Sequence, residues 1–192
     1  MAYLEHVLQR TRAFVDSKPK SERKAYGQFF TMGTSAQFMS SLFNIDQNKH
    51  SLSILDAGAG TGILTAALVD YLVACGFKGK INVTCYENDS NVLPVLRSNL
   101  EDISAHVPNF SFRVIADNFI TSQPFGGFFQ QDASYDLVIG NPPYKKISAD
   151  SPEAIHMKEV CYGAPNLYFL FMAMSVQQLK DDGQLVYIIP RS

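Results

Sequence analysis

The residues best suited to chemistry in this sequence are Asn141-Pro142-Pro143-Tyr144, which follow the apolar run 135–140. Because proline lacks a backbone N–H and holds φ nearly fixed, the run is expected to be a buried strand that ends in a stiff loop. The Asn141 side-chain oxygen and the Pro142 carbonyl can accept both N–H bonds of an exocyclic amino group on a planar ring. The Tyr144 ring can stack on that ring. A proline-rich turn is the alternative interpretation.

A second group, Asp56 and three glycines at alternate positions, predicts a turn that comes close to a ligand. Gly58, Gly60 and Gly62 lie between an apolar strand and a helical pattern that starts at Ile63. Glycine permits unusual φ values, and a strand–glycine turn–helix forms the nucleotide cleft of doubly wound folds. A pyrophosphate cofactor is disfavoured, because position 63 lacks the third glycine of the dinucleotide fingerprint. Asp56 is therefore expected to meet the ammonium group of an amino-acid-bearing ligand.

Acids end two further strand patterns. Glu87 lies at the distance past the glycines at which a carboxylate holds a ribose diol. Asp117 is expected to accept a hydrogen bond from the amino group of an adenine, and Phe119 to cover its ring. The alternatives are a surface glutamate, and a turn residue beside a core phenylalanine. Phe30 and Thr31 form a strip that either covers a bound ligand or plugs the space before the next helix.

The elements that must position these residues alternate along the chain from residue 51, which predicts an α/β fold with a parallel sheet. The helix near residues 35–43 places Phe38, Met39, Leu42 and Phe43 at core spacing. The segment 145–159 is expected to be a polar loop, and 181–183 a turn. Strands are expected at 53–56, 81–86, 112–116, 135–139 and 184–189, with helices at 3–16, 35–43, 63–75, 91–102 and 166–179.

Composition limits the possible partners. The chain has 192 residues and a formal net charge of −2, so no global basic field indicates nucleic acid. Any such contact must come from a local patch or from protein outside this chain. The three cysteines lack zinc spacing, which predicts no metal site and reduced thiols in a cytoplasmic protein. Neither a bilayer-spanning run nor a signal-peptide pattern is recognisable in the sequence.

Taken together, these motifs resemble the S-adenosylmethionine-dependent adenine-N6 DNA methyltransferases of the gamma class, in which the cofactor motifs precede the catalytic one. The resemblance covers Gly27 to Ser192 and is strongest to the methylase portion of Eco57I-type restriction–modification enzymes. Met32 departs from the family pattern, which commonly has proline after Thr31. The residues that carry the resemblance are Gly27-Gln28-Phe29-Phe30-Thr31, Asp56 to Gly62, Glu87, Asp117-Asn118-Phe119 and Asn141 to Tyr144.

The resemblance implies a Rossmann-like class I methyltransferase fold that binds S-adenosylmethionine and methylates N6 of a flipped-out adenine in DNA. It implies an N-terminal helix and linker (1–25) and a catalytic domain (26–192) that ends directly after its fifth strand. Duplex DNA would then be bound by a recognition domain outside this chain. The implied catalytic residues are Asn141, Pro142, Pro143 and Tyr144; the implied cofactor residues are Phe30, Thr31, Asp56, Gly58, Gly60, Gly62, Glu87, Asp117, Asn118 and Phe119.

Three other functions remain open on the sequence. A glutamine-N5 protein methyltransferase would use the same Asn-Pro-Pro-Tyr acceptors on a side-chain amide. An RNA adenine-N6 methyltransferase would use them on a different nucleic acid. A non-catalytic cofactor-binding fragment or assembly module would keep the glycine turn without turnover.

Overall fold

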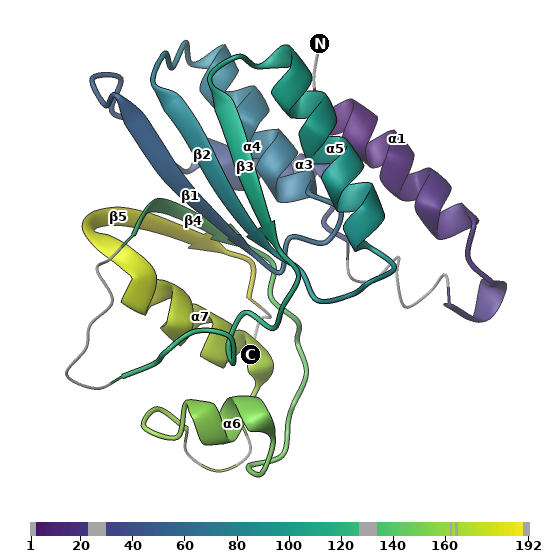
Figure 1. Ribbon diagram of the computed structural model, residues 1–192, viewed down its shortest axis with the longest axis vertical. Coiled ribbons are helices and arrows are strands. Elements are labelled where there is room, and N and C mark those ends of the chain that lie inside the picture. Colours follow the sequence, from purple (N-terminus) through teal and green to yellow (C-terminus); the bar gives the residue numbers. More distant parts are fainter. Residues whose placement is uncertain (1–2, 23–29, 127–133, 162, 164, 190–192) are drawn as a thin grey trace.

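The computed structural model describes residues 3–22, 30–126, 134–161, 163 and 165–189, and within them five strands form one parallel sheet. The strand order is β3-β2-β1-β4-β5 (Figure 1). The strands β2 and β3 are added on one side of β1, and β4 and β5 on the other, so the order of the strands switches between β1 and β4. The predicted parallel α/β fold is confirmed. The strands are β1 (Ser51–Ala57), β2 (Lys80–Tyr86), β3 (Phe110–Ile115), β4 (Tyr135–Gly140) and β5 (Leu179–Tyr187).

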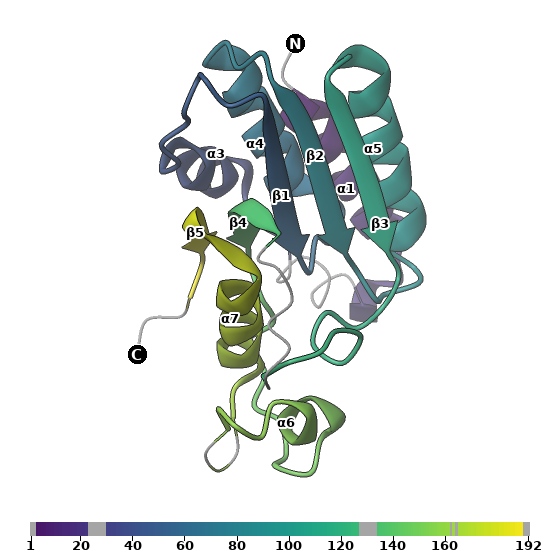
Figure 2. The ribbon, with the colours of Figure 1, turned by 60° about the vertical axis from the view of Figure 1, so that its left-hand side comes forward.

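Helices cover the sheet unequally (Figures 1 and 2). The helices α1, α3, α4 and α5 lie on one side, where their apolar residues form a core with Ile54, Ile81 and Ile139. The helix α7 lies on the other side, against β4 and β5, and forms a second core that includes Leu55 and Val138. The bounds are α1 (Tyr3–Asp16), α3 (Gly33–Ser41), α4 (Ile63–Ala74), α5 (Leu93–His106), α6 (Pro152–His156) and α7 (Leu167–Gln178).

The second side of the sheet is polar over β2 and β3. Ser53, Asn82 and Ser111 are aligned across three strands, and the Ser111 hydroxyl donates to Asn82 Oδ1 at 2.8 Å. Asn82, Ser111 and Arg113 are exposed, and no helix lies over this part of the sheet in Figure 1. Side chains alternate between the two faces of a strand, so one face can be apolar and the other wet. The doubly wound pattern therefore applies fully only around β1, β4 and β5.

The expectations for residues 35–43 and for residues 181–183 were partly wrong. The helix α3 buries Met39, and Phe43 beyond its end is also buried, but Phe38 and Leu42 are 65% and 54% exposed. A helix turns by about 100° per residue, so one apolar stripe faces the core and the adjacent residues face away. The expected turn at 181–183 lies inside β5, where the register between β4 and β5 shifts.

A short helix, α6, lies in the segment 145–159, which was expected to be loop. Pro152 occupies its first turn, and the Ser151 hydroxyl accepts the Ala154 N–H at 3.3 Å. Both features are typical helix starts, which the lack of apolar periodicity concealed. The helices within the described residues include none that is long and apolar enough to cross a bilayer.

Candidate active site

The turn between β1 and α4 is built on three left-handed glycines. Gly58, Gly60 and Gly62 have φ values of 74°, 56° and 86°, which L side chains rarely adopt. The Ala59 N–H donates to the Tyr86 carbonyl at 2.8 Å, so the turn is attached to the end of β2. The predicted glycine turn is therefore present at the carboxyl edge of the sheet, and α4 begins directly after it.

Glu87 holds this turn from the neighbouring strand. Its Oε2 accepts the Gly60 N–H at 2.8 Å, and its Oε1 accepts the N–H groups of Asn88 and Asp89, each at 2.8 Å. A carboxylate has about four acceptor sites, so these three bonds leave capacity for about one more. Glu87 is thus positioned beside the glycine turn, and its predicted contact with a ribose diol stays a prediction.

Asp56 lies fully buried at the end of β1. Its Oδ2 accepts the Thr65 hydroxyl at 2.6 Å, whereas its Oδ1 has no hydrogen-bond partner among the described residues. Burial raises the pKa of Asp56 to about 7, with a smaller upward contribution from Glu87 and a downward one from the Thr65 hydrogen bonds. An unpaired buried carboxylate oxygen is costly, and a cationic group would satisfy it. That fits the predicted contact with an ammonium group.

The loop of residues 141–144 follows β4. Asn141 Nδ2 donates to Thr31 Oγ1 at 3.2 Å, and Asn141 Oδ1 accepts the Tyr144 hydroxyl at 2.6 Å. The same hydroxyl lies 2.9 Å from the Ile188 carbonyl. The Tyr144 ring is 45% exposed and packs edge-on against Tyr168, at 6.3 Å between centroids. The amide nitrogen of Asn141 thus faces Thr31, its oxygen faces the Tyr144 hydroxyl, and Tyr144 itself is exposed.

Gly140, directly before this loop, allows Tyr187 of β5 to pack closely against the end of β4. A Cβ at this position would come within 2.5 Å of the Tyr187 ring on β5, so only glycine allows that ring to lie against the end of β4. Burial raises the pKa of Tyr187, whose hydroxyl is hydrogen-bonded to Ser175 at 2.6 Å. The following Pro142 is buried, and Pro143 is partly exposed.

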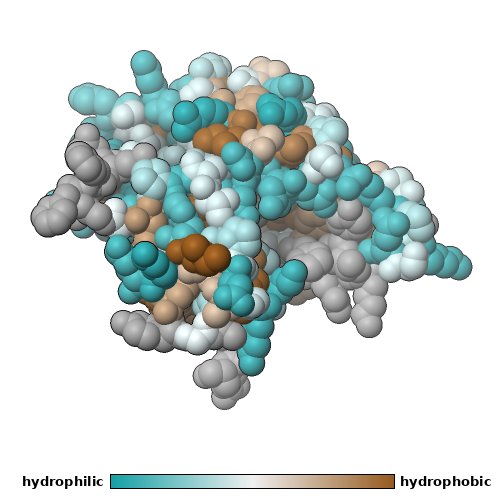
Figure 3. Space-filling view, turned by 60° about the horizontal axis from the view of Figure 1, so that its bottom comes forward, coloured by the Kyte–Doolittle hydropathy of each residue, from teal (hydrophilic) through white to brown (hydrophobic). Residues whose placement is uncertain are grey.

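One pocket brings the two motifs together. Five predicted site residues line it: Phe30, Thr31, Gly58, Gly60 and Asn141. Sequence reasoning did not single out the other lining residues, which are Ala59, Thr61, Ile63 and Leu64. Three of those lie between or directly after the glycines, so their position in the motif could have identified them. Figure 3 brings the bottom of the molecule in Figure 1 forward, where small groups of hydrophobic residues interrupt a hydrophilic surface.

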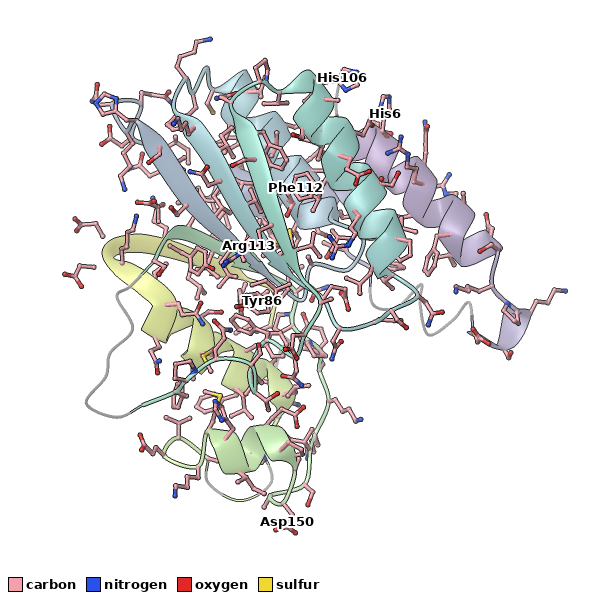
Figure 4. All side chains as sticks on the ribbon, viewed as in Figure 1. His6, Tyr86, His106, Phe112, Arg113 and Asp150 are labelled. Atoms are coloured by element: carbon pink, nitrogen blue, oxygen red, sulfur yellow. The ribbon has the colours of Figure 1, made fainter. Side chains whose placement is uncertain are left out.

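The segment Asp117–Phe119 lies outside this pocket. Phe119 is 2% exposed, and its ring packs against Tyr86 at 5.1 Å and Phe171 at 5.2 Å between centroids. Figure 4 places Tyr86 near the ends of the strands. Asn118 Oδ1 accepts the Ile120 N–H at 2.9 Å, an arrangement typical of a turn. This packing favours the core alternative for Phe119, and its predicted role over an adenine ring stays untested.

Asp117 and Asn118 make local contacts. Asp117 Oδ1 accepts the Asn118 N–H at 2.7 Å, and Asn118 Nδ2 donates to Glu153 Oε1 of α6 at 2.8 Å. These bonds connect the end of β3 to α6. The predicted residues Gly27, Gln28 and Phe29 lie outside the described part of the chain.

Comparison with known proteins identifies the family. Residues 40–192 match the family described as Eco57I restriction-modification methylase. The chain belongs to this family. It is 35% identical over 175 residues to the type II methyltransferase M.PstI of Providencia stuartii, covering 88% of this chain and 34% of that protein. It is 30% identical over 198 residues to M.BsuBI of Bacillus subtilis, covering 100% of this chain and 39% of that protein.

A solved structure agrees with the fold of this Eco57I-family chain. The methyltransferase subunit of a type I restriction-modification system from Streptococcus thermophilus superposes with a TM-score of 0.59 at 19% identity. That match covers 83% of this chain and 34% of the other. The chain has the Rossmann-like class I methyltransferase fold, and it spans between a third and two-fifths of the length of the two curated relatives above.

S-adenosylmethionine is the cofactor of this family member. Two features of the site fit it. Gly58 and Gly60 of the glycine turn line the pocket, and the buried Asp56 Oδ1 has no hydrogen-bond partner among the described residues. Glu87, at the end of the adjacent strand, would face the ribose.

Proposed function

We propose that this chain carries the cofactor site and the catalytic loop of a DNA methyltransferase that acts on N6 of adenine. The observation that carries the proposal is the orientation of Asn141, whose amide nitrogen is bound by Thr31 while its oxygen accepts a hydroxyl proton. An oxygen that accepts an O–H can accept an amino N–H in the same direction. The names of the relatives, type II methyltransferases, support DNA as the substrate.

The mechanism assigned to the loop is direct transfer. When bound, S-adenosylmethionine supplies an electrophilic methyl group on sulfur. Asn141 Oδ1 and the Pro142 carbonyl would accept hydrogen bonds from the two N6–H groups, which favours a pyramidal nitrogen with its lone pair exposed. Transfer of the methyl group to N6 would leave the cofactor as a thioether, and one N6 proton would pass to solvent. Positioning of this kind contributes up to roughly 7–11 kcal/mol in favourable cases.

Tyr144 is assigned to the target base. Its ring is exposed beside Asn141 and can stack on an adenine that has left the duplex, which offsets part of the unstacking cost. The base would displace the Tyr144 hydroxyl from Asn141 Oδ1. Contact with the duplex is assigned to residues outside this chain, because the net charge of −2 supplies few of the cations that phosphates require.

The test uses single-stranded substrate, so that no base has to leave a duplex. The 192-residue protein is incubated with S-adenosylmethionine and an oligonucleotide that contains all four bases, and the product nucleosides are identified by mass spectrometry. N6-methyladenine that disappears in Asn141→Ala is the expected result. Methylcytosine, product confined to an RNA substrate, or methylglutamine in an added release factor would each overturn the proposal.

A further inference from the structure

The N-terminal helix α1 reaches the cofactor turn directly. Thr11 on α1 is 6% exposed, and its Oγ1 lies 2.7 Å from Oγ1 of Thr61, a pocket-lining residue between two of the glycines. Thr11 Oγ1 also donates to the Val7 carbonyl at 2.7 Å. A hydroxyl has one proton, so Thr11 must accept the proton of Thr61. Thr11 therefore fixes both the direction of the Thr61 hydroxyl and its role as donor.

A second connection holds the backbone of Thr61. Asn99 on α5 is 1% exposed, and its Nδ2 donates to the Thr61 carbonyl at 2.8 Å. Arg10 on α1 donates to Asn99 Oδ1 at 3.3 Å and pairs with Asp102 at 3.4 Å. Figure 4 shows His6 of α1 and His106 of α5 near the same end of these two helices. The side chain of Thr61 is thus held by α1 directly, and its carbonyl through α5.

The helix also contacts a second residue that lines the pocket, Phe30. The Phe14 ring on α1 meets the Phe30 ring edge-on, at 6.3 Å between centroids and 74° between planes. Phe30 lies close to the glycine turn, since a Cβ at Gly60 would come within 3.4 Å of its ring. One helix therefore contacts two of the residues that line the pocket, Thr61 and Phe30.

The start of α1 is fixed on the same layer. Asp70 on α4 accepts the Tyr3 N–H at 2.8 Å and the Leu4 N–H at 3.0 Å with its two carboxylate oxygens. These are helix N-terminal N–H groups without intrahelical partners, and an anion there stabilises the helix. These two hydrogen bonds fix the start of α1 against α4, the helix that begins directly after the glycine turn.

We propose that α1 is part of the cofactor site and that Thr11 is a positioning residue that sets the rotamer of the pocket-lining Thr61. This inference rests on the binding of S-adenosylmethionine in the pocket that Thr61 lines, and it does not depend on which substrate is methylated. Removal of the Thr11 hydroxyl leaves the Thr61 hydroxyl, which is 1% exposed, without its acceptor. The freed hydroxyl must then find a partner by rotating, and the pocket that it lines changes shape.

The experiment compares Thr11→Val with Thr11→Ser by titration calorimetry of S-adenosylmethionine and by the melting temperature of the free protein. Thr11→Val is expected to raise Kd about tenfold, a difference that corresponds to about one good hydrogen bond. Thr11→Ser keeps the hydroxyl and should restore Kd to within about twofold of wild type. In Thr11→Val combined with Thr61→Val, Kd should equal that of Thr61→Val alone, because the two hydroxyls act as a unit.

Leu4→Val is the matched control, since Leu4 is buried on the same helix face two turns before Thr11. It should lower the melting temperature and leave Kd unchanged. The proposal is overturned if Thr11→Val changes only the melting temperature, as Leu4→Val does. If Thr11→Val does not fold, Thr11→Ala takes its place, because it also removes the hydroxyl that faces Thr61, and it should raise Kd about tenfold. An unchanged Kd in Thr11→Ala would then overturn the proposal.

Discussion

Two buried aspartates on neighbouring strands occupy opposite ends of the sheet, and their surroundings differ. Asp136, at the start of β4, is 6% exposed and fully paired: Lys49 Nζ lies 2.6 Å from its Oδ1, and Lys180 Nζ lies 3.0 Å from its Oδ2. The Ser53 N–H adds a bond to Oδ2 at 2.8 Å. Asp56, at the end of β1, has one hydroxyl partner and one oxygen without any among the described residues.

The two carboxyl groups consequently titrate in opposite directions. Burial alone would raise the pKa of Asp136, but the hydrogen bonds from Lys49, Ser53 and Lys180 outweigh burial and hold its pKa below the ordinary value. Burial dominates at Asp56 and raises its pKa to about 7. The acid at the amino end of the sheet is fully paired within the fold, whereas the acid at the carboxyl end has one oxygen without a hydrogen-bond partner among the described residues.

The largest effect is expected at the carboxyl end, in Asn141→Ala. Loss of the N6 acceptor should lower the methylation rate by roughly two or more orders of magnitude, because this interaction is made in the transition state. The dissociation constant for S-adenosylmethionine should change little. Single-turnover rates and calorimetry measure the two quantities. Near-normal turnover in this variant would exclude the assigned mechanism.

The amino end should respond in stability instead. Asp136→Asn leaves two lysines without their anion and should cost about 2 kcal/mol of unfolding free energy, since the lysines are partly exposed. A lowered pKa gives stability that is present above about pH 4 and is lost as pH falls, so the variant should lack this acid-dependent part. Urea titrations from pH 3 to 7 measure it, with Asp182→Asn at an exposed position of β5 as the control. A pH profile identical to wild type would contradict the expectation.

Glu87→Ala should weaken S-adenosylmethionine binding about tenfold, because it removes the proposed ribose partner and three bonds to backbone N–H groups. A 2′-deoxy analogue of S-adenosylhomocysteine separates the two causes by calorimetry. Wild type should bind the analogue more weakly than S-adenosylhomocysteine, and Glu87→Ala should bind the two alike. If the variant still discriminates between them, another residue holds the ribose.

The smallest expected effect is the number of protons released when S-adenosylmethionine binds. With a pKa of about 7, Asp56 is about half protonated at pH 7 in the free protein. An ammonium group beside it favours the charged form, so S-adenosylmethionine binding should release up to about half a proton. Calorimetry in buffers of different ionisation enthalpy measures this release, and Asp56→Asn should abolish it. Equal release in the variant would place the ammonium group elsewhere.

The same variant sharpens the contrast with Asp136. A raised pKa gives stability that is complete below about pH 4 and is lost as pH rises towards 7. The free wild-type protein should therefore lose stability relative to Asp56→Asn as the pH rises from about 4 to 7, opposite in sign to Asp136.

Local patterns predicted much of this arrangement. Alternate glycines after an apolar strand required positive φ values, and all three have them. Parallel strands placed Gly60 and Asn141 at one edge, and both line the same pocket. The sequence also located Asp56, although its unpaired oxygen depends on the packing of α4.

Other features depend on contacts between residues far apart in the sequence, which no local pattern can predict. Thr11 and Thr61 are fifty positions apart, and Lys49 and Asp136 are farther apart still. Phe119 follows an acid at a strand end, yet Tyr86 and Phe171 surround it. Whether such an aromatic faces a ligand or the core is decided by neighbours from other elements.

The register between β1 and β4 sets where the glycine turn and the loop that begins at Asn141 leave the sheet. Asp56 is paired with Ile139, so Gly58 and Asn141 each lie two residues beyond a matched pair. Adjacent strands are about 4.8 Å apart, so the glycine turn and the loop that begins at Asn141 leave the sheet side by side, at the same level. Backbone hydrogen bonds set that separation, whatever the length of chain that connects the strands. Insertions in the β3–β4 connection should leave the distance between the two loops intact. A single residue added within β4 should instead shift Asn141 relative to the glycine turn.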